Sequence, residues 1–182
     1  MEKSLVILKP DASERKLVGN IISRFEAADL KIVDTRMTLA NDRQIDKHYQ
    51  IDNDDYCISI GCKNFNTPIL PYAEAVTKYG KERSDELKNN GKMILGWNRN
   101  YMKRSPLFVM IIEGDGAISR IREIVGSTNP EKASPGTIRA EYGIDNFERS
   151  NNEERGCENL VHASGSIEEA IREIEIWFPE NA

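Results

Sequence analysis

The sequence predicts an α/β (α+β) fold in which an antiparallel sheet carries helices on one face. A short apolar run at residues 4–8 is followed by helical spacing over residues 19–28 and by an alternating, strand-like stretch at residues 30–39. The most apolar run, residues 107–114, is followed by a second helical pattern over residues 115–125. Strand–helix–strand therefore occurs twice, which predicts a ferredoxin-like βαββαβ sandwich.

Shorter elements complete this order. Residues 42–49 are predicted to form a short helix, and residues 137–142 and 158–162 precede the C-terminal helix. At the start of that helix, Ser166 and Glu169 fit a capping box, in which the serine caps the first turn and the glutamate reaches back to it. Helical spacing then places five apolar side chains on an inner face: Ala170, Ile171, Ile174, Trp177 and Phe178.

The composition is typical of one soluble domain and argues against several classes of function. The chain has 182 residues, of which 39% are hydrophobic and 30% charged, so we expect a single domain over residues 1–182. A net charge of −5 argues against general nucleic-acid binding, and no run of about 20 apolar residues could span a membrane. The N-terminus lacks a signal-peptide pattern, and the three cysteines lack zinc or redox spacing, which together predict a cytoplasmic protein with free thiols.

His162 is the strongest candidate for a reactive side chain, because it lies among small polar residues at a predicted strand-to-helix junction. Helix N-termini offer free N–H groups to anions, and a neutral imidazole can accept a phosphoryl group. Glu173 falls on or beside the apolar face of the next helix and needs a partner, which His162 could supply. A carboxylate on one ring nitrogen fixes the tautomer and leaves the other nitrogen free to attack. From these residues alone, an ordinary loop histidine and a snorkelling glutamate remain open alternatives.

The segment Asn159-x-x-His162-x-Ser164-x-Ser166 resembles the active-site signature of the nucleoside diphosphate kinases. Five further segments resemble the same family in the same order: residues 5–11 ending in Lys-Pro-Asp, a helix at 17–26, the pair His48-Tyr49, residues 126–130 and residues 134–139. The resemblance covers most of the chain outside residues 51–92. It implies the ferredoxin-like fold with an inserted helical hairpin. It also implies transfer of the terminal phosphate of a nucleoside triphosphate to a nucleoside diphosphate, by a ping-pong mechanism through a phosphohistidine on His162.

The resemblance further implies roles for individual residues. Glu173 would orient the imidazole, Ser164 would support that pair or contact the phosphate, and Asn159 would bind the sugar hydroxyl. The remaining site residues would contact the nucleotide phosphates: Lys9, with Tyr49 close to it, Arg122, Thr128 and Arg139. Mg²⁺ would bridge the nucleotide phosphates mostly through water, without a direct protein ligand. The implied partners are nucleoside tri- and diphosphates and further copies of the chain in a hexamer or related homo-oligomer, with no specific nucleic acid and no membrane.

Two stretches depart from the compact members of the family and are similar to its longer form. Residues 51–92 are an insertion in which residues 72–79 could be helical, with a break expected at residues 89–91. Residues 143–157 are a second insertion, and the polar part at residues 149–155 is predicted to be a surface loop. Neither stretch has the character of a separate domain.

Several assignments stay open at this point. Trp97, Leu95 or a residue of the 51–92 insertion could stack on the nucleotide base, and stacking would tolerate all bases. His48 is interpreted as structural or solvent-facing, away from the group around His162. The alternative functions are a catalytically inactive nucleotide-binding regulatory protein, a protein-histidine phosphocarrier and a metal-site histidine. The metal site is disfavoured because the chain has only two histidines.

Overall fold

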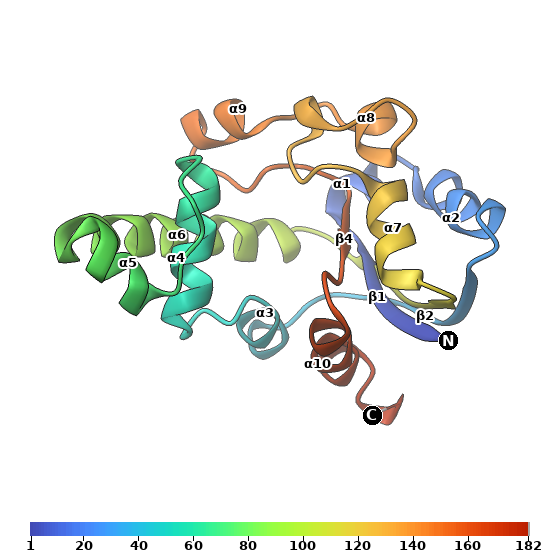
Figure 1. The fold of residues 1–182 in the computed structure, drawn as a ribbon. Helices are drawn as coiled ribbons and strands as arrows, with labels where there is room; N and C mark the ends of the chain where they lie inside the picture. The colour runs from blue at the N-terminus through green and yellow to red at the C-terminus, as the bar shows by residue number, and fades with distance from the viewer. Residues whose placement is uncertain (182) are drawn as a thin grey trace.

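The computed structural model describes residues 1–181 and contains a four-stranded antiparallel sheet. Its strands are β1 Glu2–Leu8, β2 Lys31–Thr38, β3 Leu107–Gly114 and β4 Val161–Ala163, in the spatial order β2-β3-β1-β4 (Figure 1). The central strand β1 pairs with β3 along its whole length, and its end, from Val6 to Leu8, also pairs with β4. This topology confirms the predicted mixed α/β, ferredoxin-like fold.

One face of the sheet is covered by α2 Val18–Ala27 and α7 Ala117–Val125, the two helices that the sequence places between strands. Val6 and Leu8 of β1 are fully buried in the core on this side, together with apolar residues of both helices. The helices form here because their apolar residues recur every three or four positions and make a continuous stripe. This layer is the one predicted from the sequence.

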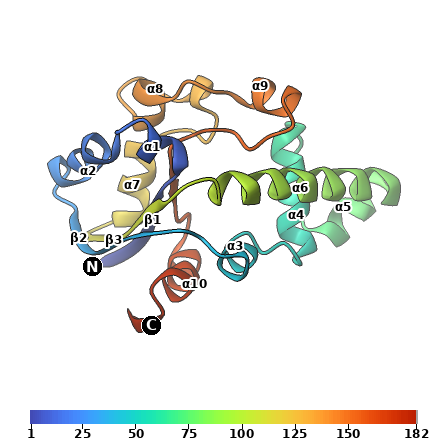
Figure 2. The same cartoon turned by 180° about the vertical axis from the view of Figure 1, so that it is seen from behind.

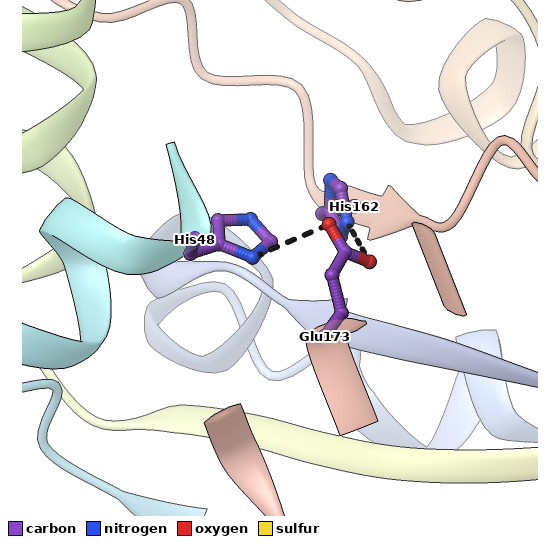
Figure 3. A group of neighbouring side chains, drawn as sticks. All are labelled: His48, His162 and Glu173. Carbon is purple, nitrogen blue, oxygen red and sulfur yellow. Dashed lines mark hydrogen bonds and ion pairs between the residues drawn. The ribbon is translucent and has the colours of Figure 1, made fainter. Parts of the chain in front are cut away.

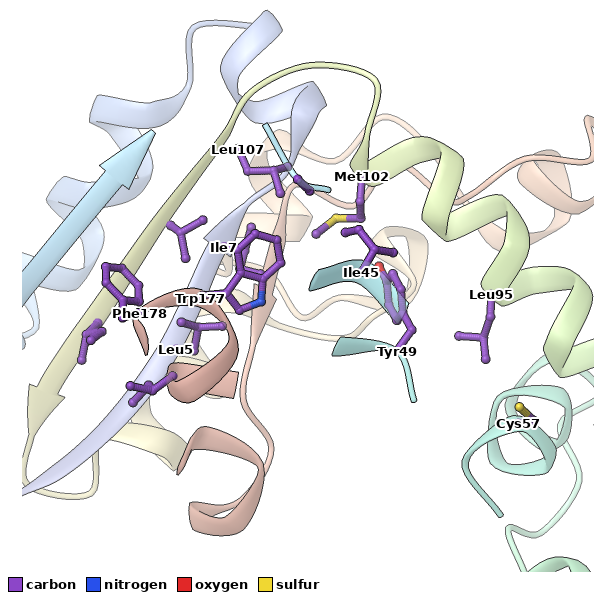
Figure 4. Packing of buried hydrophobic residues seen from close by; sticks show 14 residues of the cluster. Leu5, Ile7, Ile45, Tyr49, Cys57, Leu95, Met102, Leu107, Trp177 and Phe178 are labelled. Carbon is purple, nitrogen blue, oxygen red and sulfur yellow. The ribbon is translucent and has the colours of Figure 1, made fainter. Parts of the chain in front are cut away.

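The opposite face is covered as well, which the sequence-based prediction of helices on one face did not include. Leu5 and Ile7 of β1 point to this side and pack with Trp177 of α10 Ile167–Trp177 and with the following Phe178 (Figure 4). The physical reason is that β1 and β3 are apolar on both faces, so both faces must be shielded from water. This second core places α10, and with it Glu173, against the sheet.

A group of helices between β2 and β3 extends to one side of the sheet (Figures 1 and 2). It comprises α3 Asp42–His48, α4 Asp54–Asn64, α5 Tyr72–Tyr79 and α6 Lys81–Met102. The helices predicted at residues 42–49 and 72–79 are therefore present. The break predicted at residues 89–91 is wrong, because α6 runs through this segment without interruption.

The glycine that suggested a break is a packing residue. Gly91 of α6 meets Gly61 of α4 where the two helices cross, and a Cβ atom on Gly91 would lie 1.8 Å from the carbonyl oxygen of Cys57. A Cβ atom on Gly61 would likewise lie 1.9 Å from the carbonyl oxygen of Leu87. Two glycines let the two backbones approach more closely than any side chain would allow.

We expect Gly91→Ala to destabilise the protein by about 1–3 kcal/mol or more, because the added methyl group collides with backbone that cannot turn away. Gly96→Ala on the same helix is the matched control, since nothing lies within 4 Å of its added Cβ. The control should stabilise the protein by about 0.5–1 kcal/mol through helix propensity. Urea unfolding of both variants measures the difference, and equal free energies of unfolding would contradict the proposed close crossing.

The remaining helices are short. They are α1 Pro10–Glu14, α8 Ile138–Tyr142, α9 Phe147–Asn152 and two short 3₁₀ helices, η1 Pro130–Lys132 and η2 Pro179–Asn181. One of them, η2, lies beside the edge strand β2, where Glu180 pairs with Arg36. The surface loop predicted at residues 149–155 is thus partly helical. Asn146 accepts a hydrogen bond from the N–H of Arg149 and starts α9, which buries Ser150. Within residues 1–181, none of the helices has both the length and the apolar character to cross a membrane.

The start of α10 differs in one detail from the predicted capping box. Ser166 caps the helix by accepting the N–H of Glu169 at 3.1 Å, as expected. The Glu169 carboxylate, however, accepts the N–H of Gly165 at 2.7 Å rather than that of the capping serine. The hydrogen bond from the backbone to Glu169 is therefore made one residue before the N-cap, in the turn that leads from His162 into α10.

Candidate active site

His162 lies in the middle of β4, opposite Ile7 of β1, and its ring is hydrogen-bonded to Glu173 of α10 (Figure 3). His162 Nε2 is 2.9 Å from Glu173 Oε2. Because an ionised carboxylate can only accept, Nε2 carries the proton and Nδ1 has the free electron pair. Burial, reinforced by the charge of Lys9, lowers the pKa of His162 to about 3, so the imidazole is neutral at physiological pH. The predicted pairing of these two residues is present.

Glu173 is buried to 1% exposure, and its carboxylate has several partners. Ser164 donates its hydroxyl to Oε2 at 2.7 Å, next to the bond from His162. Burial raises the pKa of Glu173, while the Ser164 hydrogen bond and the charge of Arg172 oppose that rise. Ser164 is itself completely buried, so of the two roles expected for it the geometry favours support of the pair over contact with a phosphate.

His48 belongs to this group, which corrects the expectation that it lies away from His162. Its ring, at the end of α3, is 2% exposed and therefore not solvent-facing. His48 Nδ1 is 3.3 Å from Glu173 Oε1, and the rings of His48 and His162 meet edge to face with centroids 4.4 Å apart (Figure 3). A long-range contact of this kind leaves no signal in local sequence patterns, because the two histidines are far apart along the chain.

A tight turn leads into His162. The N–H of Val161 donates to the carbonyl of Asn159 at 2.7 Å, and Leu160 between them has a φ angle of +67°. Such a three-residue γ-turn is strained for a branched residue and persists only when its surroundings hold it. Here Lys9 N–H binds the carbonyl of Leu160 at 2.8 Å, and Asp11 accepts the N–H of Leu160 at 3.2 Å.

Arg139 holds the same turn through its guanidinium group. Nε donates to the carbonyl of Asn159 at 3.0 Å, one terminal nitrogen donates to the carbonyl of Val161, and the other donates to Gly126 at 2.8 Å. Burial and the charge of Arg122 lower the pKa of Arg139 to about 10, which leaves it charged at neutral pH. Three of its five N–H groups are thus used, and two remain for a ligand. Arg139 was predicted as a phosphate ligand, and its clamp on the turn is an additional role.

Lys9 and Asn159 form a polar chain next to His162. Lys9 Nζ donates to the side-chain oxygen of Asn159 at 2.7 Å, and the Asn159 amide donates to the carbonyl of Thr128 at 2.9 Å. Both side chains are more than nine-tenths buried. Burial and the nearby Arg139 lower the pKa of Lys9 to about 8. Asn159 therefore fixes the lysine and the 126–130 loop, in addition to the sugar contact predicted for it.

A cavity of about 320 Å³ opens in front of His162, a size that suits a small-molecule site. All the nucleotide ligands predicted from the sequence line it, along with the nucleophile: Lys9, Tyr49, Arg122, Thr128, Arg139, Asn159 and His162. Glu173 and Ser164 lie behind His162 and do not line the cavity. The structure thus brings the residues predicted to contact the nucleotide together around one cavity.

The other end of the cavity is formed by helices that the sequence analysis did not resolve. Tyr56 and Ile60 of α4, Trp97 of α6 and Phe147 of α9 line it. Trp97 thus remains a candidate for base stacking, whereas Leu95 is only 1% exposed in the core and is removed as one. The four-residue spacing of Tyr56 and Ile60 was the available signal in the sequence, since it places both on one side of a helix.

The α4 and α9 walls are joined across the cavity by side-chain amides. Asn151 of α9 donates to the side-chain oxygen of Asn64 of α4 at 2.7 Å, and Asn64 donates in turn to Asn90 of α6 at 3.1 Å. The stretch that was predicted to be a second insertion, residues 143–157, therefore contributes to the cavity itself rather than only to the surface.

Comparison with known proteins gives consistent matches over the whole chain. The family model "Nucleoside diphosphate kinase" matches residues 2–61 and 87–182. A nucleoside diphosphate kinase of Pyrobaculum aerophilum is 41% identical over 181 residues, which cover 99% of this chain and 96% of the relative. A crystal structure of an NDP kinase from the same organism superposes with a TM-score of 0.83 at 38% identity and covers 99% of this chain and 97% of that one. A transition-state mimic of the Borrelia burgdorferi enzyme, with bound vanadate and ADP, gives a TM-score of 0.74 at 29% identity, with coverage of 99% and 88%.

Proposed function

This chain belongs to the nucleoside diphosphate kinase family, and we propose that it passes the transferred phosphate through His162. It is a phosphotransferase that moves the terminal phosphate of a nucleoside triphosphate to a nucleoside diphosphate. The observation that carries the role of His162 is its pairing with Glu173. Nε2 is held by the carboxylate, and Nδ1 is left free on a ring that lines the cavity.

The tautomer held by Glu173 suits a transfer that needs no proton movement. The free electron pair of His162 Nδ1 attacks the terminal phosphorus, the bond from phosphorus to the bridging oxygen breaks, and the nucleoside diphosphate leaves with that electron pair. The ring gains positive charge as the N–P bond forms, and Glu173 stabilises this charge through the Nε2 proton. In the second half, a terminal oxygen of another nucleoside diphosphate attacks the phosphohistidine in the same site. One site therefore serves a ping-pong exchange.

Lys9, Arg122 and Arg139 would bind the phosphates, together with the hydroxyl of Thr128, because all four line the cavity beside His162. Phosphoryl transfer spreads negative charge over the equatorial oxygens, and fixed cations stabilise that charge most when they need not move. Lys9 and Arg139 are held by hydrogen bonds to buried partners. Arg122 and Thr128 are exposed on the cavity rim, where they can follow the substrate.

Magnesium would enter as part of the substrate, bound to the nucleotide phosphates. Glu169 is the one carboxylate that lines the cavity within residues 1–181, so the protein offers no cage of oxygen ligands there. The neighbouring group of His48, His162 and Glu173 is rich in nitrogen and already hydrogen-bonded, which does not suit Mg²⁺. The ion would neutralise charge on the phosphates, while the protein residues bind and orient them.

The base would lie between the apolar walls of the cavity, against Tyr56, Ile60 and Trp97. Stacking on aromatic and apolar surfaces accepts every base because each base has a π face. We therefore expect both purine and pyrimidine nucleotides to be substrates.

The chain would form a single domain with insertions at residues 51–92 and 143–157. The gap in the family match at residues 62–86 supports an insertion within the first of these stretches, whereas the second lies inside the matched residues 87–182. A homo-oligomer, hexameric or related, is supported by the edge position of β2 and the exposed Met37 on it. A cytoplasmic location is supported by the three cysteines, which are all unpaired.

The pKa of Lys9 predicts how activity depends on pH. Because this pKa is lowered to about 8, the lysine of the free enzyme loses its charge as the pH rises through 8, and phosphate binding should weaken. We expect kcat/KM to fall by up to tenfold per pH unit above about pH 8. His162, with a pKa of about 3, should cause no loss between pH 5 and 7. The Lys9→Met variant should have a lower kcat/KM at pH 7, and its kcat/KM should no longer decrease above about pH 8. A wild-type profile that stays flat to pH 9.5 would contradict the assignment.

The exchange mechanism is tested by incubating the pure protein with γ-labelled ATP and Mg²⁺ in the absence of an acceptor. We expect label on the protein that is acid-labile and base-stable, as a phosphohistidine is. Added GDP or CDP should remove the label from the protein, and the label should then be found in GTP or CTP. A protein that binds ATP but takes up no label would instead indicate a catalytically inactive nucleotide-binding protein on this scaffold.

A further inference from the structure

The carboxylate of Glu173 divides its two oxygens between different partners. Oε2 accepts hydrogen bonds from His162 Nε2 at 2.9 Å and from Ser164 at 2.7 Å. Oε1 faces His48 Nδ1 at 3.3 Å (Figure 3). An Arg172 nitrogen lies further away from Oε1, at 3.7 Å. The orientation of the whole carboxylate therefore depends on what holds Oε1, because rotation about its last bond would carry Oε2 away from His162.

His48 is rigidly held on the side of the carboxylate away from the cavity. It is the last residue of α3, its ring is 2% exposed, and its carbonyl accepts a hydrogen bond from Arg172 at 3.3 Å. Its ring stands edge to face against those of Tyr49, His162 and Trp177. His48 is not among the residues lining the cavity, so a direct contact with the nucleotide is not available to it.

Two groups compete for His48 Nδ1. Burial, together with the charges of Arg172 and Lys9, lowers the pKa of His48 to about 3 against the opposing effect of the Glu173 charge, so the ring is neutral. A neutral ring has one N–H, and Nδ1 either donates to Glu173 Oε1 or accepts from the indole N–H of Trp177, which lies 3.4 Å away. A hydrogen bond from an N–H group to an ionised carboxylate is stronger than one from an indole N–H to a neutral imidazole nitrogen. The tautomer with the proton on Nδ1, which makes the bond to Glu173, is therefore favoured.

We propose that His48 is a positioning residue for phosphate transfer, in which its Nδ1–H holds Oε1 of Glu173 so that Oε2 stays directed at His162 Nε2. The inference rests on the proposed role of His162 as the phosphate carrier. The nucleophile is then oriented by a chain of side chains, from His48 through Glu173 to His162, that joins α3, α10 and β4. The hydrogen bond from His48 matters most when His162 gains positive charge during the transfer. If the Glu173 carboxylate turned away at that point, the charged imidazole ring would have no partner.

Two substitutions at His48 distinguish the effect of its hydrogen-bond donor from the effect of its ring volume. His48→Phe keeps a ring of similar size and removes the donor, whereas in His48→Asn the amide nitrogen occupies nearly the position of Nδ1 and restores the donor. We expect kcat of His48→Phe to fall about tenfold, with KM for ADP within about twofold of wild type. His48→Asn should regain most of the lost kcat. A folded His48→Phe protein with wild-type kcat would overturn the proposal.

The tautomer of His48 in the wild-type protein gives a test that no variant can spoil by misfolding. Nitrogen-15 NMR should find the proton of His48 on Nδ1 and that of His162 on Nε2. A proton on Nε2 of His48, with Trp177 donating to Nδ1, would overturn the proposal even if both variants were unfolded. Failure of the function itself is a separate result, since the wild-type protein would then take up no phosphate from γ-labelled ATP, whatever the tautomer of His48.

Discussion

Replacing His162 by alanine is expected to lower kcat for phosphate exchange by roughly 10⁵-fold or more, the loss seen when a covalent nucleophile is removed. The reason is that the cavity has no substitute for it. His48, the other histidine, lies behind the carboxylate and does not line the cavity. The affinity for ADP should stay within a few fold of wild type, because Lys9 and the two arginines are unchanged. Steady-state kinetics and calorimetric titration with ADP measure the two effects.

The same variant distinguishes an enzyme from an inactive binding protein. If the protein only bound nucleotides, His162→Ala would keep its nucleotide affinity and lose no measurable function. An acid-labile label that still formed on His162→Ala protein after incubation with γ-labelled ATP would contradict the assignment of the nucleophile. Glu175→Ala is a suitable control, because this exposed carboxylate lies on α10, as Glu173 does, but outside the cavity.

Much of the fold was predictable from the sequence because the patterns that specify its strands and helices lie within short segments of the chain. The strands and the helices α2 and α7 were predictable from the spacing of apolar residues. The pairing of His162 with Glu173 was predictable from the position of the N-cap residue of α10. Ser166 starts α10 directly after the turn, so the second turn of the helix returns beneath β4 and brings Glu173 to the imidazole. A separation of eleven residues is short enough for a local argument to succeed.

The errors occur where the decisive contact is between distant segments. Gly91 looked like a helix breaker, but Gly61 on another helix makes a glycine necessary there. His48 looked isolated in the sequence, yet α3 packs against α10 and places its ring on Glu173. Neither partner could be identified before the arrangement of the helices was known, since glycine and histidine are each compatible with several surroundings.

The walls of the cavity illustrate a third limit of the sequence. The polar residues of 149–155 suggested a surface loop, whereas the first four of them belong to α9, which is capped by Asn146, and Asn151 binds Asn64. Polar composition indicates exposure on average, but asparagine amides also join two elements when both are present. The end of the cavity around His162 was easier to predict because its cations match a family pattern, while the other end depends on how α4, α6 and α9 meet.

Glu173→Gln is expected to lower kcat on the order of 10³-fold while KM for nucleotides changes little, as for other carboxylates that orient a catalytic histidine. Glutamine keeps the size of the side chain but offers an amide, which can donate to His162 Nε2 and so favour the proton on Nδ1. That tautomer lacks the free electron pair with which Nδ1 attacks the phosphate. Glu173→Asp is the matched control, because it keeps the charge at a shorter reach and should lose less activity. Equal kcat values for Glu173→Gln and wild type would contradict the orienting role.

The same substitution should leave the free energy of unfolding unchanged or raise it. Glu173 is 1% exposed, and burial raises its pKa, which means that folding must desolvate a group whose ionised form the interior disfavours. A neutral amide of the same shape avoids that cost, although it gives up the charge-assisted bonds to Ser164 and His162. A protein that is as stable as wild type, or more stable, but nearly inactive would show that this buried charge is kept for catalysis at the expense of stability. Thermal unfolding measured alongside kcat decides the point, since a large loss of stability would instead assign Glu173 to the fold.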